Sequence, residues 1–169
     1  METNVSQLLQ EPIGATRYRD IDASLRGIGK DELVFHGDCR LLRTRLGILV
    51  ICKLDTAIEM TCSRCLETYS QPIHVAFEEE FVPTVDVISG VALNAPEDPN
   101  TFIIDSHHIL DVREAVRQYT LLAIPLKPLC REDCAGLCPT CGKNLNEGPC
   151  DCPPVDIDPR WAVLKKLLK

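Results

Sequence analysis

The sequence has few aromatic residues and no long apolar run, and both shortages limit what the protein can be. Phe, Trp and Tyr make up 5% of the 169 residues, with a single Trp. A surface that stacks nucleic-acid bases on aromatic rings is therefore not expected. No run of about 18 apolar residues is present to span a membrane. Residues 1–12 contain no basic flank followed by an apolar stretch, so we expect no secretory signal and a cytoplasmic protein.

The motifs of several enzyme classes are also missing. The sequence has no GxxxxGK[ST] phosphate loop, no HExxH zinc-protease helix and no zinc-deaminase pattern. His107 and His108 lie in a region rich in Pro, Asp and Asn, where we expect solvated histidines. The acidic run at 78–80 alternates between the two faces of an expected strand, so it does not converge as an acid–base pair. We therefore expect a protein that is not an enzyme and has no small-molecule substrate.

Cysteine, by contrast, is abundant, with ten residues in the chain, six of them between residues 130 and 152. Because the cytosol keeps thiols reduced, this number predicts metal binding rather than disulfides. A CPTCG knuckle and a CDC pair offer four thiolates, which satisfy a tetrahedral structural zinc ion and leave no open position for chemistry. We expect about one zinc per chain. The predicted ligands are Cys138, Cys141, Cys150 and Cys152.

The remaining cysteines permit several roles. Cys130 and Cys134 could replace one pair as ligands, join a two-metal site with bridging thiolates, or be small buried hydrophobes. Cys62 and Cys65 could be half of a zinc site completed from elsewhere in the fold, or a tight turn with two reduced thiols. A redox dithiol is not favoured, because a strand rather than a helix follows the pair. The two cysteines that stand singly in strand patterns are expected in the core, and they are Cys39 and Cys52.

Hydrophobic periodicity predicts an α+β fold that begins with strands. Residues 16–60 and 69–82 alternate apolar and polar side chains, which predicts an antiparallel sheet or a partly closed barrel. Within the first range, strands are expected near 33–45 and 48–60. Residues 83–108 contain three prolines with Asp and Asn around them, and we expect a surface loop there.

Two helices are expected after this loop. Residues 110–123 carry an apolar stripe that should pack on the sheet, and a proline follows them. The stripe consists of Val112, Ala115, Val116, Tyr119, Leu122 and Ala123. A short C-terminal helix is predicted to start with Asp158 as its N-cap and Pro159 at its first position. We therefore expect a sheet domain over 1–125 and a zinc-knuckle segment ending in a short helix over 126–169.

Charge is unevenly distributed along the chain, whose net charge is −7. Residues 54–114 carry twelve acidic and two basic side chains, whereas residues 13–53 and 115–169 each have a small basic excess. Because phosphate contacts need Lys and Arg, any RNA contact is expected outside the acidic middle, although simple solvated faces would show the same pattern. Arg43 and Arg45 are expected on one strand face. The candidate RNA contacts are Arg40, Arg43, Arg45, Lys53, Lys165, Lys166 and Lys169.

Several motifs occur in an order that resembles the YceD-like family. They are CSRCLE at 62–67, FEEEF at 77–81, LLAIPLKPLC at 121–130, GLCPTCGKNLN at 136–146 followed by CDC, and DPRW at 158–161. The resemblance covers roughly residues 30–169, and the family members are called large ribosomal RNA subunit accumulation proteins. It implies a bacterial, cytoplasmic factor with plastid relatives, needed for accumulation or processing of the large-subunit (23S) rRNA.

The resemblance also bears on the role of the cysteines. Some family members keep the CxRC pair but lack the C-terminal cysteine cluster, which fits a stabilising metal better than a shared activity. The expected function is a non-enzymatic accessory factor in large-subunit biogenesis, with structural zinc and with large-subunit rRNA or a pre-ribosomal protein as partner. The alternative is a zinc-stabilised protein–protein adapter without RNA contact, which would use the acidic region 78–114 to meet a basic partner.

Overall fold

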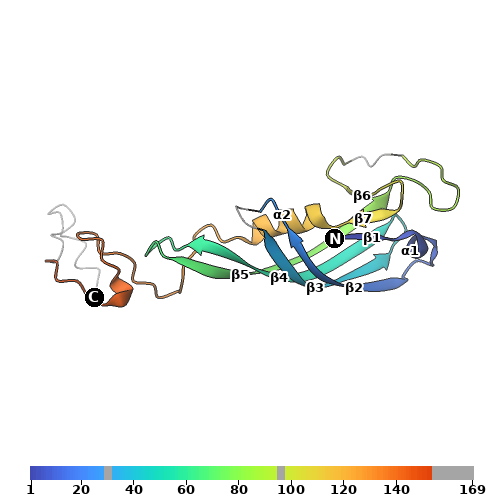
Figure 1. Ribbon diagram of the computed structural model, residues 1–169. Helices are drawn as coiled ribbons and strands as arrows, with labels where there is room; N and C mark the ends of the chain where they lie inside the picture. The colour runs from blue at the N-terminus through green and yellow to red at the C-terminus, as the bar shows by residue number, and fades with distance from the viewer. Residues whose placement is uncertain (29–31, 95–97, 154–169) are drawn as a thin grey trace, which may run out of the picture. The chain divides into compact units, whose positions relative to one another are not determined.

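The structure is a computed structural model that describes residues 1–28, 32–94 and 98–153. Seven strands form one sheet in the order β1-β7-β6-β5-β4-β3-β2 (Figure 1). The strands are β1 (Glu2–Asn4), β2 (Thr16–Leu25), β3 (Leu33–Arg43), β4 (Ile48–Thr61), β5 (Thr68–Pro83), β6 (Phe102–Ile104) and β7 (Ile109–Asp111). The helices are α1 (Ser6–Gln10), α2 (Arg113–Ala123) and the 3-10 turn η1 (Leu145–Glu147). No helix in these ranges is long and apolar enough to cross a membrane.

The chain forms two compact units. The first contains Met1–Glu59 and Ser70–Leu126, and the second contains Met60–Tyr69 together with the described part of Lys127–Lys169. The tip of the β4–β5 hairpin therefore belongs to the same unit as the cysteine-rich segment. The expected boundary at residue 125 instead places this tip in the sheet domain. The C-terminal helix predicted after Asp158 lies outside the described residues.

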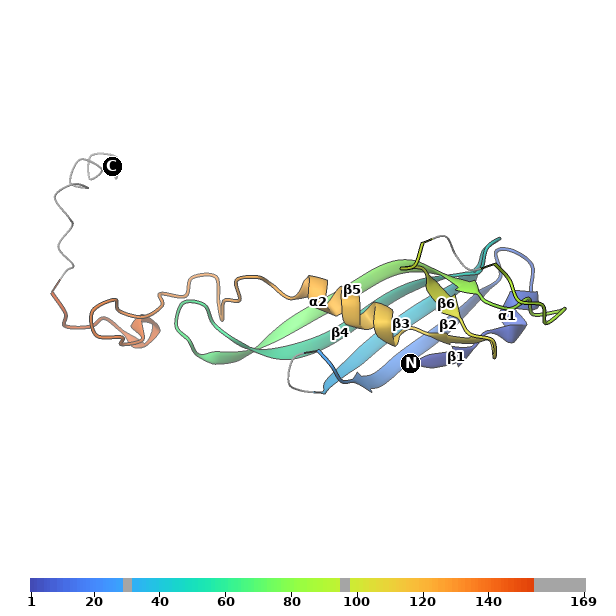
Figure 2. The same ribbon diagram turned by 90° about the horizontal axis from the view of Figure 1, so that it is seen from above.

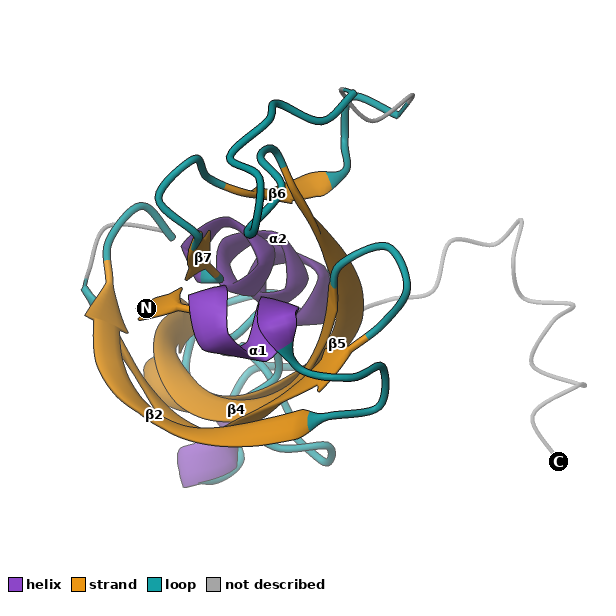
Figure 3. Ribbon diagram, turned by 90° about the vertical axis from the view of Figure 1, so that its right-hand side faces the viewer, coloured by secondary structure: helices purple, strands orange, loops and turns teal. Residues whose placement is uncertain are grey.

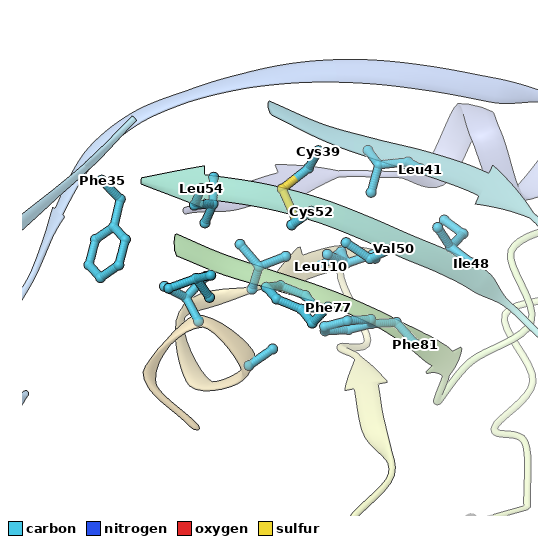
Figure 4. Packing of buried hydrophobic residues seen from close by; sticks show 14 of the residues in the cluster. Phe35, Cys39, Leu41, Ile48, Val50, Cys52, Leu54, Phe77, Phe81 and Leu110 are labelled. Carbon is cyan, nitrogen blue, oxygen red and sulfur yellow. A yellow bond between two sulfur atoms is a disulfide. The ribbon is translucent and has the colours of Figure 1, made fainter. Parts of the chain in front are cut away.

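The four long strands follow the alternation that the sequence predicts. Along β4, Val50, Cys52 and Leu54 are buried while Lys53 and Asp55 are exposed. This period of two arises because successive side chains of a strand point to opposite faces. Figure 4 shows the inward side chains of β3, β4 and β5 packed together. The predicted strands near 33–45, 48–60 and 69–82 are confirmed, with ends that differ by at most two residues.

The curved sheet has α1 and α2 on its concave side, as Figures 2 and 3 show. Ala115 and Val116 of α2 are fully buried, and Tyr119 stacks on Phe77 of β5 with ring centroids 5.1 Å apart. The predicted stripe is wrong at its C-terminal end, because Leu122 is 78% exposed. A partly closed, mostly antiparallel sheet with a helix on its inner face thus matches the coarse expectation.

Three short strands and α1 are not predicted by the sequence pattern. Residues 109–111 pair with β1 on one side and β6 on the other, so they form β7 instead of the first turn of the predicted helix. The helix α2 consequently begins at Arg113, whose backbone N–H donates to Oδ1 of Asp111 at 3.0 Å. The short strand β6 runs parallel to the end of β5 and interrupts the region expected to be a surface loop.

A disulfide joins Cys39 of β3 to Cys52 of β4 within the core (Figure 4). The two residues are direct partners in the antiparallel register, and their Cα atoms lie 4.1 Å apart. Their expected core position is confirmed, with exposed fractions of 2% and 1%. The expectation that the cysteines bind metal rather than form disulfides is wrong for this pair, because the strand register places the two inward side chains opposite each other.

Candidate metal centres

The eight cysteines with free thiols form two groups of four. Within each group, all four Sγ atoms lie within 4.8 Å of one another. Both groups belong to the second compact unit. The first tetrad is Cys62, Cys65, Cys130 and Cys134, and the second tetrad is Cys138, Cys141, Cys150 and Cys152.

The first tetrad joins the turn between β4 and β5 to the segment that follows α2. In the turn, the backbone N–H of Leu66 donates to the Cys62 carbonyl at 3.0 Å, and Leu66 has a positive φ of 62°. The Arg64 guanidinium donates to the backbone carbonyls of Glu132 at 3.2 Å and Cys134 at 2.9 Å. These bonds hold two segments together that are far apart in the chain.

The sulfur positions of the first tetrad fit a tetrahedral ion. The Sγ atoms of Cys62 and Cys134 are 3.8 Å apart, and those of Cys65 and Cys130 are 3.7 Å apart. Four sulfurs at about 2.3 Å from a central ion would be separated by about 3.8 Å. Three of the four side chains are at most 4% exposed, and Cys130 is half-buried. The residues therefore fit a closed, four-thiolate metal site without an open coordination position.

The second tetrad is built from local turns and is more exposed. The backbone N–H of Gly142 donates to the Cys138 carbonyl at 2.9 Å, and the positive φ of 74° at Gly142 lets the knuckle fold back. The N–H of Thr140 points at the Cys138 sulfur at 3.4 Å. Cys138 is 6% exposed, Cys141 is exposed, and the CDC pair is half-buried. The contact from the Thr140 N–H to the Cys138 sulfur is the geometry that a metal knuckle needs.

Each tetrad combines thiols of lowered pKa with thiols of raised pKa. Backbone N–H groups, of Cys130 and then Cys65, lower the pKa of Cys62 to about 6, and those of Cys141 and Thr140 do the same for Cys138. Burial raises the pKa of Cys130 to about 12. The hydrogen bond between the Cys152 and Cys141 side chains, with burial, raises the pKa of Cys152 to about 12. Four crowded sulfurs thus share protons that a bound divalent cation would displace.

The structure groups the cysteines more specifically than the sequence does. The four predicted ligands in the CPTCG and CDC motifs stand together as the second tetrad. Cys130 and Cys134 do not join them and instead complete the half-site offered by Cys62 and Cys65. The geometry therefore provides two separate sites, where the sequence led us to expect about one ion. No spacing rule connects residues 62 and 65 to residues 130 and 134, so only the fold reveals this pairing.

The candidate RNA contacts lie at different kinds of position. Arg40 and Lys53 are exposed on the outer face of the sheet, next to the inward Cys39 and Cys52. Arg45 is exposed in the turn between β3 and β4. The expected contacts Lys165, Lys166 and Lys169 lie outside the described residues.

Arg43 differs from these three residues. Its guanidinium donates to the backbone carbonyls of Leu9 at 3.1 Å and Gly47 at 3.0 Å, and also to that of Thr44. The expectation that Arg43 and Arg45 share a strand face is wrong, because β3 ends at Arg43 and Arg45 belongs to the turn. The Arg43 guanidinium therefore binds backbone carbonyls of the turn and of α1, and its donors are not directed at an external phosphate.

The other polar candidates do not converge on a common point. Glu79 accepts a hydrogen bond from the Tyr119 hydroxyl, and Glu80 accepts one from Thr44 at 2.5 Å. His107 is exposed and its backbone N–H donates to Asp105 at 2.9 Å. Glu79 and Glu80, which are neighbours on β5, thus have separate partners, as the alternation of faces predicts.

Comparison with known proteins yields one family match that covers most of the chain. The family described as large ribosomal RNA subunit accumulation protein YceD matches residues 50–168. This range includes all eight cysteines of the two tetrads. No solved structure matches the chain.

Curated relatives come from mycobacteria and a plant. A protein of Mycobacterium tuberculosis, described as uncharacterised, is 31% identical over 131 residues, covering 78% of this chain and 60% of its own length. Its Mycobacterium leprae counterpart is 28% identical over the same length. A Zea mays protein named large ribosomal RNA subunit accumulation protein YCED homolog 1, chloroplastic, is 30% identical over 125 residues, 60% of this chain and 43% of its own length. The chain thus spans about 60% of the mycobacterial relatives.

Proposed function

The chain belongs to the YceD family of large ribosomal RNA subunit accumulation proteins, and we propose on this basis that it is a non-enzymatic, cytoplasmic factor in large-subunit biogenesis. The family match over residues 50–168 carries the proposal. The name of the maize relative supports the same process. Two closed cysteine tetrads add a physical reason, because a site with four protein ligands stabilises a shape and has no position left for a substrate.

The function proposed for the two tetrads is to hold one structural zinc ion each. Thiolate ligands favour soft or borderline metals such as zinc, Cu(I) and iron–sulfur clusters. Closed four-thiolate sites in which the paired ligands come from short turns are typical of structural zinc. Elemental analysis combined with native mass spectrometry should find two zinc ions per chain. A fully folded protein without metal, or one with stoichiometric iron, would overturn this assignment.

The proposed partner is large-subunit rRNA, contacted in part through exposed basic residues of the first unit. Arg40, Arg45 and Lys53 are exposed, and none of them is in an ion pair in the described part of the chain. Their side chains are therefore free to neutralise phosphates and release counterions. The surrounding sheet face also carries Asp38, directly opposite Lys53, so we expect a contact of modest strength.

Deletion of the gene tests the proposed process. Cells without the protein should accumulate precursor large-subunit rRNA at the expense of the mature form, whereas small-subunit rRNA should be unchanged. Northern blots of both subunits measure this, and re-expression of the wild-type chain is the control. Unchanged large-subunit rRNA in the deletion strain would contradict the proposed function.

Binding of purified protein to a large-subunit rRNA fragment tests the contact separately. The triple variant Arg40→Ala, Arg45→Ala, Lys53→Ala should weaken binding and reduce the slope of log K against log salt by roughly 2–3. Arg26→Ala is the matched control, because Arg26 is also exposed but is paired with Glu32 at 3.0 Å. An unchanged slope in the triple variant would exclude this surface as the RNA contact.

A further inference from the structure

The loop formed by residues 143–147 connects the two ligand pairs of the second tetrad, yet two of its side chains contact the first tetrad or the turn that carries it. Cys141 precedes this loop and Cys150 follows it, so both of its ends lie close to ligands of the second tetrad. The backbone N–H of Leu145 donates to the Gly136 carbonyl at 2.9 Å. The Asn144 amide donates to Glu67, in the hairpin turn of the first tetrad, at 2.8 Å. The loop is therefore shared by the two sites.

Asn146 makes the most direct contact of the loop. Its Nδ2 lies 3.4 Å from the Sγ of Cys134, a ligand of the first tetrad, and 2.8 Å from Oδ1 of Asn144. Its Oδ1 accepts from the backbone N–H of Ala135 at 2.8 Å and from the Arg131 guanidinium at 2.6 Å. Because both of these partners can only donate, the amide oxygen must face them, and the NH₂ group must face the sulfur. The orientation of Asn146 is thus fixed by its hydrogen-bond network.

An N–H donor at this position suits a thiolate that binds metal. Four thiolates around a divalent ion leave a net charge of −2. A hydrogen bond to one sulfur offsets part of this charge and holds that ligand in its orientation, as outer-shell partners of metal ligands commonly do. Asn146 can do this as a neutral donor, and the nearby Arg131 keeps its guanidinium on the amide oxygen.

The loop itself has little apolar packing to keep it in place. None of the residues of η1 is buried, and residues 143–147 are exposed or half-buried. Its order therefore depends on hydrogen bonds and on the fixing of its two ends, since segments with few buried contacts open at low free-energy cost. An ion held by Cys141 and Cys150 would fix both ends of the loop at once.

We propose that the two metal sites are coupled through this loop, with Asn146 as the positioning residue. Metal in the second tetrad holds residues 143–147 in place, which keeps Asn146 on Cys134 and strengthens metal binding at the first tetrad. Because coupling between two binding equilibria is reciprocal, metal in the first tetrad strengthens binding at the second by the same factor. The inference rests on the proposed metal content of the tetrads and adds to it a role for a residue that is not a ligand.

Competition titrations with a zinc chelator of known affinity test the coupling on the full chain, with the sulfur-to-cobalt absorption of the Co²⁺-loaded protein as a second readout. Asn146→Ala should keep two ions per chain but lower the metal affinity of the first tetrad by about 10-fold to 100-fold. Asn146→Asp should weaken it further, because a carboxylate beside a thiolate repels it. Asn94→Ala, at an exposed position of the first unit, is the control and should bind like wild type.

A double-mutant comparison separates coupling from a simple local effect. Cys150→Ser removes one ligand of the second tetrad. It should also lower the metal affinity of the first tetrad, although it changes no ligand of the first tetrad. When Asn146 is already Ala, the same Cys150→Ser change should have little further effect on the first tetrad. If Asn146→Ala does not fold, Asn146→Ser provides the same comparison.

The possible outcomes distinguish this inference from the proposed function. If the wild-type chain holds two ions but the metal affinity of the first tetrad is unchanged in Asn146→Ala or in Cys150→Ser, the coupling is overturned and the zinc assignment stands. Additive effects in the double variant would overturn it as well. Absence of bound metal in the wild-type chain would instead overturn the zinc assignment, and the coupling with it.

Discussion

The Sγ atoms of Cys65 and Cys130 lie 3.7 Å apart, although 65 positions of the chain separate the two residues. A metal ion at this point would close a loop that contains all of β5, the short strands β6 and β7, and α2. The second tetrad, in contrast, lies entirely within residues 138–152. The two sites should therefore contribute differently to folding, even though both offer four thiolates.

Loss of one ligand from each tetrad should show this difference. Cys65→Ser and Cys150→Ser each remove a single sulfur, but the first weakens the site that closes the long loop and whose remaining cysteines are mostly buried. The entropy of loop closure alone favours the longer cross-link by about 1–2 kcal/mol. We expect Cys65→Ser to lower the free energy of unfolding by at least that much more than Cys150→Ser, as measured by denaturant titration at saturating zinc. Equal destabilisation by the two variants would contradict the expected difference between the two sites.

The second tetrad could be predicted from the sequence because its ligands are local. Cys138 and Cys141 belong to one turn, and Cys150 and Cys152 follow within a few residues, so spacing alone brings them close. The first tetrad depends on where the β4–β5 turn meets the chain after α2. No pattern around Cys62 records which later residues that turn meets.

The long strands could be predicted for a similar reason, and the short ones could not. An eleven-residue strand such as β3 shows several periods of alternation, whereas three residues such as Ile109–Asp111 fit a strand or a helix equally well. The strand register is also invisible in the sequence, so Cys39 and Cys52 could be assigned to the core but not to each other. Leu122 fits the helical stripe by spacing, yet its side chain is exposed, and spacing alone does not show where the buried face of a helix ends.

The Cys39–Cys52 disulfide predicts a specific thiol count. Eight of the ten cysteines carry free thiols, and the disulfide accounts for the other two. Protein denatured with a chelator but without reductant should react with eight equivalents of a thiol reagent, and prior reduction should raise this to ten. The variant Cys39→Ala, Cys52→Ala is the control and should give eight under both conditions. Ten reactive thiols in the unreduced wild type would show that this bond is absent in solution.

Arg43 should contribute to stability, and Arg45 should not. The Arg43 guanidinium donates to three backbone carbonyls at the end of α1 and in the β3–β4 turn. Arg43→Ala removes these three hydrogen bonds, although the Gly47 carbonyl keeps the backbone N–H of Thr44 at 3.0 Å, and the loss should cost about 1–3 kcal/mol. Arg45→Ala changes an exposed turn residue and should stay within about 0.5 kcal/mol of wild type. Chemical denaturation of the two variants measures both values, and a neutral Arg43→Ala would refute the assigned role.

Glu114 should make stability depend on pH in the acid range. Hydrogen bonds from Arg117 and Gln118 lower the pKa of the Glu114 carboxyl from 4.5 to about 2. A carboxyl whose pKa is lower in the folded protein than in the unfolded chain stabilises the fold above pH 4.5, and this contribution is lost as the pH falls towards 2. Because the Glu114 side chain is 51% exposed, solvent screening limits the effect to about 0.3–0.5 kcal/mol.

The variant Glu114→Gln removes this dependence and provides the measurement. It should be less stable than wild type at pH 7, and the difference should vanish near pH 2, where wild-type Glu114 is itself becoming protonated. Each comparison is made at one pH, so any loss of metal in acid affects both proteins alike. Glu59→Gln, at an exposed position of β4, is the control and should show no such difference. A destabilisation of equal size at pH 7 and pH 2 would mean that the shape of Glu114, and not its charge, stabilises the start of α2.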